Sequence, residues 1–176
     1  MKIDFKTLNM MQLRSSPGEV LDRVARDGDV FVIERSGEPR ACLVPVSFLL
    51  PDISPARITE ELRKLTERSE NYKLTINEQK ELEINCHETA AGEDMVLSIV
   101  LPHGYPASAP RIYALPVAPN TPNRWQDGAL SIFGVTASWN PRAHDVVHAL
   151  SLARAWLKDY AKWRRTGDWP GRADGR

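Results

Sequence analysis

Apolar residues alternate with polar ones in two segments in the middle of the chain and run almost continuously in a third, and this pattern predicts β-strands. The segments are residues 74–76, 82–87 and 95–101, and residues 91–94 have the composition of a turn between the last two. Alternation at every second position places the apolar side chains on one face of a sheet. A short turn between consecutive strands favours antiparallel pairing. The sequence therefore predicts an antiparallel meander.

Helical spacing of apolar residues flanks this meander on both sides. Ile58, Leu62 and Leu65 recur at helical intervals, with charged residues between them, in the segment from 55 to 70. A second apolar set of the same period occupies residues 144–160. Such spacing is typical of amphipathic helices that cover one face of a sheet. The order of helix, meander, irregular loop and helix predicts an α+β fold.

The N-terminal region has its own helix signals. Ser16 is a capping residue type, Pro17 suits the first helical position, and Glu19 stands three residues after the cap. This combination predicts a helix that begins at Pro17, with a capping box at its N-terminus. Apolar residues at 20, 21, 24 and 25 lie on one helical face, and Gly28 is placed to end the helix in a left-handed conformation.

A predicted hairpin follows that helix. Residues 30–33 and 41–44 are strand-like, and the segment 35–38 between them contains a glycine suited to a tight turn. A hairpin on one short helix buries little apolar surface, and an isolated hairpin is marginally stable in water. We therefore expect residues 1–50 to associate with a second copy and form a dimer.

Two prolines mark a boundary between these regions. Residues 51–55 end one hydrophobic pattern before the next helix begins, which is typical of a linker. The predicted organisation is a small domain at 1–50, the linker, a larger domain at 56–170 and a frayed tail at 171–176.

Composition excludes some functions and favours none. The 23 basic residues balance the 23 acidic ones, so no strong overall field draws the protein to nucleic acid or membrane. Cys42 and Cys86 are far apart and are predicted to be buried free thiols, with no metal-ligand cluster around them. No run approaches the roughly 20 apolar residues needed to span a bilayer, and no signal peptide is evident. These features predict a cytoplasmic protein without a metal or cofactor.

The N-terminal strand, the helix signals around residues 11–21 and the hairpin resemble the Phd/YefM (prevent-host-death) antitoxin family over residues 1–50. The resemblance implies dimerisation and an operator-DNA surface near the start of the helix, where Arg14, Ser15 and Lys6 would lie close to phosphates. The alternative is a solvated helix start without DNA. Residues 1–53 carry seven basic and eight acidic residues, so this region has no excess of positive charge with which to bind phosphates.

Four groups of landmark residues occur in the C-terminal half. They are Tyr105 to Pro110, Thr121-Pro122-Asn123, Asp127 to Ser131, and Trp139-Asn140-Pro141, and Asn123 and Trp139 each stand eight positions from Ser131. Their order and spacing resemble the ubiquitin-conjugating enzyme family (UBC/RWD-like) across residues 55–170. The ending at residues 156–170 is similar to the prokaryotic branch of that family. Ser131 stands where the family has its reactive cysteine, and Thr121 replaces a histidine.

A serine at this position changes the chemistry. A thiol has an ordinary pKa of about 8.5 and ionises readily, whereas a hydroxyl needs a general base within hydrogen-bond reach. No histidine stands in a recognisable triad arrangement with Ser131, and Cys86 lies on a predicted mid-sheet strand. The resemblance implies that Asn123 stabilises an oxyanion, although asparagine also suits a turn. Ser131 and Asn123 are thus the candidate residues of a degenerate site.

We therefore expect a non-catalytic, regulatory protein of a bacterial ubiquitin-like conjugation, defence or toxin–antitoxin system. Its expected partner is a ubiquitin-like protein or an activating-enzyme-like protein. One alternative is an enzyme that forms an oxyester at Ser131. Another is an operator-binding repressor. A third, weaker signal is the group of tryptophans and basic residues near the C-terminus, which suits either a helix core or base stacking.

Overall fold

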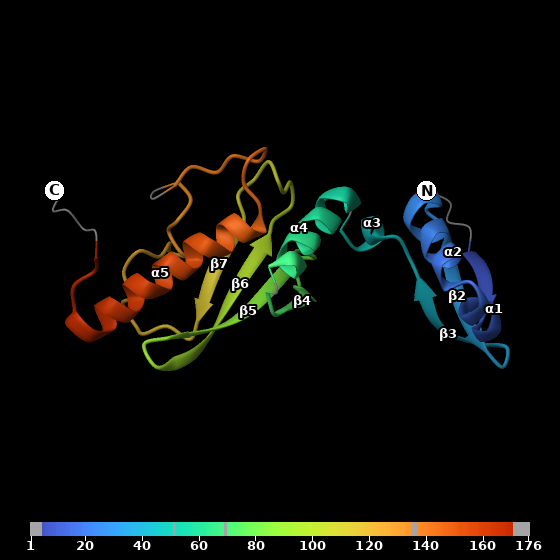
Figure 1. Ribbon diagram of the computed structural model, residues 1–176, viewed down its shortest axis with the longest axis horizontal. Helices are drawn as coiled ribbons and strands as arrows, with labels where there is room; N and C mark the ends of the chain where they lie inside the picture. The colour runs from blue at the N-terminus through green and yellow to red at the C-terminus, as the bar shows by residue number, and fades with distance from the viewer. Residues whose placement is uncertain (1–4, 51, 69, 135–136, 171–176) are drawn as a thin grey trace. The chain divides into compact units, whose positions relative to one another are not determined.

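The computed structural model describes residues 5–50, 52–68, 70–134 and 137–170. The chain divides into two compact units, Met1–Pro51 and Asp52–Arg176, and each has its own sheet and helices (Figure 1). The predicted α+β class is confirmed. The tail predicted at 171–176 lies outside the described residues, as does Pro51 of the predicted linker.

The first unit contains a three-stranded sheet of order β1-β2-β3. Its strands are β1 (Phe5–Asn9), β2 (Val30–Arg35) and β3 (Glu38–Leu43), with β1 parallel and β3 antiparallel to β2. The predicted hairpin is therefore present. Its turn residues Ser36 and Gly37 both have positive φ, 56° and 79°, which is the backbone twist that two-residue hairpin loops favour.

The helical part of this unit consists of three short segments, α1 (Met10–Ser15), α2 (Pro17–Asp22) and the π-helical turn η1 (Arg23–Asp27). Gly28 ends the last segment with φ 74°, as predicted. The predicted capping box at Ser16 is wrong, because the Ser16 side chain makes no cap hydrogen bond. The capping box lies at Asn9 and Gln12 instead, since the chain leaves β1 at Asn9 and becomes helical at once.

The core of the first unit is small. Leu8, Val20, Val24 and Phe31 are buried together. The predicted burial of Cys42 is wrong, because this thiol lies on the outward side of edge strand β3, which is exposed along most of its length. A four-residue helix, α3 (Val46–Leu49), follows the sheet.

The second unit is a meander flanked by two helices. Its elements are α4 (Pro55–Glu67), β4 (Tyr72–Ile76), β5 (Leu82–Ala90), β6 (Glu93–Leu101), β7 (Arg111–Leu115) and α5 (Val146–Thr166), and all neighbouring strands pair antiparallel in the order β4-β5-β6-β7. The three predicted strands and both helices are present. The sequence interpretation missed β7, a five-residue strand between Pro110 and Pro116. It also made the linker one residue too long, since Pro55 is the first residue of α4.

The core of the second unit lies between one face of the sheet and the helices. Ile84, Leu97 and Ile99 point to this face and are fully buried, together with Cys86, whose predicted burial is confirmed. Helix α5 packs against β5 and β6 and also contacts α4 (Figure 1). The opposite face of the sheet is not covered by either helix. We call it the open sheet face; Glu83, Asn85, Val96, Ser98 and Tyr113 line it.

Candidate functional site

The segment that carries the candidate residues is tied to the core by its backbone. Leu130 N donates a hydrogen bond of 2.7 Å to Ile112 O, which fixes the segment beside β7. The Ala118 amide donates to the buried Tyr160 hydroxyl on α5, at 3.1 Å. These bonds hold an otherwise irregular stretch against the sheet and α5, so the side chains between them have defined positions.

Asn123 and Ser131 are brought together by a backbone hydrogen bond. Ser131 N donates to Asn123 O at 3.0 Å, and the Trp156 indole N–H donates to the same carbonyl at 3.1 Å. Asn123 has φ 55°, a left-handed conformation that asparagine tolerates better than most residues. Its side chain is exposed, and Ser131 is partly exposed. Asn123 is thus a turn residue whose amide group faces solvent near Ser131.

The residues around Ser131 that could assist a nucleophile have structural hydrogen bonds. Asp127 Oδ1 accepts from Ala129 N at 3.0 Å and thereby closes the turn that contains Gly128. The buried Thr121 hydroxyl donates to Ala118 O. Both side chains therefore help to fix the backbone of this loop.

Cys86 lies on the sheet, outside this segment. It is 1% exposed on the inward face of β5. Burial, followed by the nearby charge of Glu70, raises the pKa of the Cys86 thiol to about 11, so the thiolate is scarce at neutral pH.

Trp139 covers the far end of this segment. Its indole N–H donates to Pro106 O at 2.8 Å, and its ring contacts Phe133 edge-on with a centroid distance of 5.2 Å. Tyr105 lies on its other side at 5.9 Å. The tryptophan therefore packs two landmark segments against each other.

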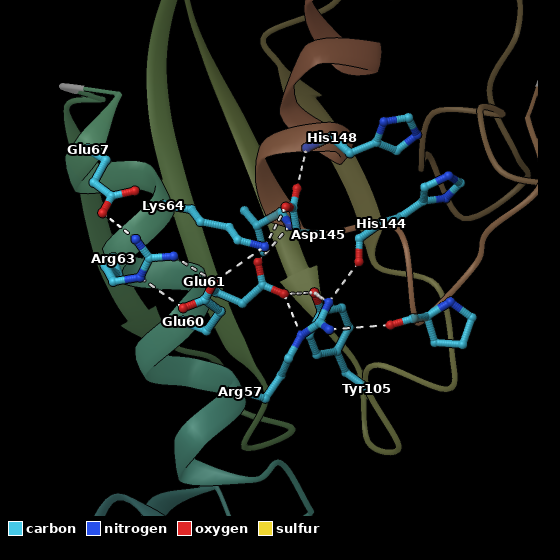
Figure 2. Close-up of polar contacts among 12 residues, drawn as sticks. Arg57, Glu60, Glu61, Arg63, Lys64, Glu67, Tyr105, His144, Asp145 and His148 are labelled. Carbon is cyan, nitrogen blue, oxygen red and sulfur yellow. Dashed lines mark hydrogen bonds and ion pairs between the residues drawn. The ribbon is translucent and has the colours of Figure 1, made fainter.

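A buried ionic cluster, shown in Figure 2, fixes the loop that leads into α5. The Glu61 carboxylate is 1% exposed and accepts from Arg57 Nε at 2.7 Å, from Val146 N at 2.8 Å and from the Tyr105 hydroxyl. Arg57 also donates to the carbonyl of His144, at 2.8 Å. Burial and the hydrogen bond to Glu61 raise the pKa of the Tyr105 phenol far above its ordinary value, so the phenol stays a donor.

Sequence reasoning missed the function of this cluster. A glutamate four residues after an arginine on a helix is usually an exposed surface pair. The signal that could have identified Glu61 is its position beside Ile58 and Leu65, on the apolar side of the α4 helix.

The start of α5 contains two further polar contacts. Asp145 is the N-cap and accepts from His148 N at 2.8 Å. Burial opposes ionisation of this carboxyl, but hydrogen bonds from His148 and Lys64 hold its pKa below the ordinary value. The rings of His144 and His148 stack at 4.0 Å, and His148 Nε2 is buried without a hydrogen-bond partner among the described residues. Burial, followed by the proximity of His144, lowers the pKa of His148.

The predicted DNA-contact residues lie in the first unit in different settings. Arg14 is exposed in the last turn of α1. Ser15 Oγ donates to Gln12 O at 3.0 Å. Lys6 forms an ion pair with Asp29, which Arg23 also binds at 2.7 Å. Of the three residues, Arg14 is the one that presents a charged group with no ion pair in the described part of the unit.

A shallow hollow of about 540 Å³ lies on the open sheet face. Its floor contains Val96, Tyr113 and Leu115, and Leu115 is 57% exposed. Glu83 and Asp127 border it, and Arg111 pairs with Glu81 at its edge. The hollow is therefore lined by apolar side chains of β6 and β7 together with polar and acidic groups, and its Glu83 and Asp127 form no ion pair within the described residues.

Other classes of site were sought in the described ranges. No group of three or more His, Cys, Asp or Glu side chains there is placed to hold a metal ion. No helix in the same ranges has both the length and the apolar character required to cross a bilayer.

Comparisons with known proteins give a distant structural likeness. No protein-family model matches the sequence, and no curated protein matches it either. Among solved structures, the chain is similar to the Vps23 UEV in its complex with ubiquitin, with 14% sequence identity and a TM-score of 0.41. That match covers 61% of this chain and 85% of the other.

Proposed function

We propose that residues 52–170 form a ubiquitin-conjugating-like domain that binds a ubiquitin-like protein without accepting it covalently. The proposed setting is a bacterial ubiquitin-like conjugation, defence or toxin–antitoxin system, in which the chain acts as a binding or regulatory protein. The observation that carries this proposal is Ser131 itself, paired through its backbone with Asn123, at the position where the family resemblance requires a cysteine.

The surroundings of Ser131 support a non-catalytic site. Asp127 and Thr121 contribute hydrogen bonds that close the backbone of the loop around Ser131. Cys86 is buried with a pKa of about 11, and Cys42 belongs to the other unit. Neither cysteine is thus placed in this loop to carry a thioester.

The open sheet face supplies a surface for non-covalent binding. Proteins associate through an apolar centre surrounded by polar groups that exclude water from the contact. Here Val96, Tyr113 and Leu115 provide apolar side chains, Asn85 and Ser98 provide polar ones, and Glu83 and Asp127 provide negative charge. A complementary partner would present apolar side chains bordered by lysine or arginine.

The first unit is proposed to act as a self-association module. Phe5, Met11 and Leu21 are 59%, 80% and 56% exposed in the single chain, which is unusual for three large apolar side chains in so small a unit. Burial against a second copy would add apolar area that the small core of this unit lacks. Sedimentation velocity of the unmodified chain and of the Leu21→Glu variant tests this. The proposal expects a dimer for the unmodified chain and a monomer for the variant, and a monomer in both cases contradicts it.

Operator binding by this unit is a second, separable proposal. The exposed guanidinium of Arg14 is the group that favours it. A mobility shift on the chain's own promoter DNA should be lost as salt rises and weakened by Arg14→Ala. No salt-sensitive shift at all would remove this proposal and leave the binding function of the second unit untouched.

Titration of a labelled ubiquitin-like protein against two matched variants tests the main proposal. Leu115→Asp on the open sheet face should raise the Kd by about tenfold or more, because a charge enters an apolar contact. Leu74→Asp on β4 is the control, since Leu74 is also well exposed, at 41%, but does not line the hollow. Equal effects of the two variants, or no binding by the unmodified chain, would refute the proposal.

A further inference from the structure

The solvent side of helix α5 carries a row of cations. Lys158, Lys162 and Arg165 are spaced by four and three residues, so their side chains lie on one face of the helix, and all three are exposed. None of them forms an ion pair within the described residues. By contrast, Arg154 and Arg164 on the same helix pair with glutamates of the second unit. The row is therefore left out of the ion pairs in that part of the chain.

A hollow of about 290 Å³ borders this row on the side of the β5–β6 turn. Small and apolar side chains form most of its wall, and the row contributes Lys158; its lining includes Thr89, Ala90, Ala91, Leu157, Lys158 and Ala161. Ala91 and Gly92 make the two-residue turn with φ 55° and 79°, so that only a methyl group and a hydrogen stand at the tip. The hollow is thereby left open beside the helix.

The charge of this surface is positive. Arg154 pairs with both Glu70 and Glu88, at 2.7 Å each, so these three groups leave one negative charge beside the hollow. Lys158 offsets that charge, and Lys162 and Arg165 add two further cations along the helix, with no ion pair in the described part of the chain. A segment that fits must combine carboxylates with small apolar side chains.

The neighbouring aromatic rings argue against base stacking at this surface. Trp156 is 6% exposed and packs on Tyr160 at 5.5 Å, and Trp169 contacts Trp156 at 5.2 Å and Trp163 at 6.4 Å. These rings pack against one another near the C-terminal end of α5, whereas stacking with a nucleobase requires an exposed ring face. The chain as a whole also has no net charge. An acidic protein segment is favoured over nucleic acid.

We propose that the α5 cation row and the adjoining hollow form a docking site for an acidic, extended segment of a partner protein. Carboxylates of that segment would pair with Lys158, Lys162 and Arg165, and a small apolar side chain would enter the hollow. This surface is distinct from the open sheet face, so the inference stands or falls separately from the proposed binding of a ubiquitin-like protein.

Fluorescence anisotropy with a fluorescein-labelled peptide of alternating glutamate and valine tests the site. The double reversal Lys158→Glu/Lys162→Glu should raise the Kd by about tenfold, because two exposed attractions become repulsions. The variant Ala161→Phe, which fills the hollow and keeps every charge, should also weaken binding. Thermal denaturation of each variant confirms that the fold is kept.

The control is the double reversal Lys73→Glu/Arg142→Glu, which changes the net charge equally at two exposed positions elsewhere. It should leave the Kd nearly unchanged. The proposal is overturned if both double reversals weaken binding equally, since a general field would then explain the affinity, or if no saturable binding occurs. It is also overturned if labelled oligothymidylate binds more tightly than the peptide and depends on the same lysines.

Discussion

Replacement of Glu61 by glutamine removes one charge from the second unit while it preserves the shape of the side chain. In the folded protein the Glu61 carboxylate accepts hydrogen bonds from Arg57, Tyr105 and Val146, and it is 1% exposed. The glutamine side chain would place its N–H₂ group, a donor, against N–H and O–H groups that are also donors. It would also leave the part-buried Arg57 without its counter-charge. The variant therefore creates unsatisfied buried donors and a poorly compensated cation together.

The expected loss follows from these contacts. An unsatisfied buried donor costs about 1–3 kcal/mol, and removal of one partner from a buried ion pair costs about 3–5 kcal/mol. We expect Glu61→Gln to lower the free energy of unfolding of the second unit by about 3 kcal/mol, a large part of the roughly 5–15 kcal/mol that stabilises a domain. In a double-mutant cycle with Arg57→Met, the two losses should fall short of additivity by about 1–3 kcal/mol.

Urea unfolding followed by tryptophan fluorescence measures this loss in the correct unit, because all five tryptophans lie beyond residue 52. Arg63→Gln is the control. Arg63 lies on the same helix and pairs with Glu60 and Glu67, but it is half exposed, and its loss should leave the urea midpoint almost unchanged. A change of less than about 1 kcal/mol for Glu61→Gln, or strict additivity in the cycle, would refute the reasoning.

Three further predictions concern thiols, acid and backbone strain. Cys42 should react quickly with a thiol reagent in the native protein, whereas buried Cys86, with a pKa of about 11, should react only on unfolding; equal rates would contradict the assigned burial. The folded-state pKa of His148 is lowered, so the unfolded chain takes up this proton first, and stability should be lost as pH falls below about 6.5. His148→Gln should reduce the difference in urea midpoint between about pH 7 and pH 5.5, and an unaltered difference would exclude His148 as its source. Gly128→Ala should destabilise the second unit by about 1 kcal/mol, because φ at Gly128 is 88° and the added methyl would come within 2.9 Å of the Arg124 guanidinium; a stability equal to that of the unmodified chain would show that the turn relaxes.

The sequence predicted those elements whose signals are local. Strand β5 alternates apolar and polar residues from Leu82 to His87, and Gly92 suits the positive φ of 79° in the turn to β6, so pattern and turn chemistry agree there. The backbone hydrogen bond between Ser131 and Asn123 joins residues only eight positions apart. It is consistent with the spacing of the landmark residues and also depends on a short stretch of sequence.

The features that were missed depend on contacts between distant segments. Glu61 becomes a buried hydrogen-bond acceptor for Val146 N only because α4 packs beside the start of α5, 85 residues later in the chain. Strand β7 is short and lies between prolines, and it pairs because β6 offers a free edge. Cys42 has apolar neighbours in sequence, but the edge position of β3 exposes it. Propensity is a weak prior wherever tertiary packing sets the outcome.

The central claim is that the second unit binds a ubiquitin-like protein and does not become covalently linked to it. The most direct test incubates the chain with a cognate activating enzyme, ATP and the tagged ubiquitin-like protein, then records intact mass and native association in the same sample. The account predicts association without any mass increase, for the unmodified chain and for Ser131→Ala alike. A thiol-resistant, hydroxylamine-sensitive adduct that disappears in Ser131→Ala would contradict it and establish oxyester chemistry at Ser131.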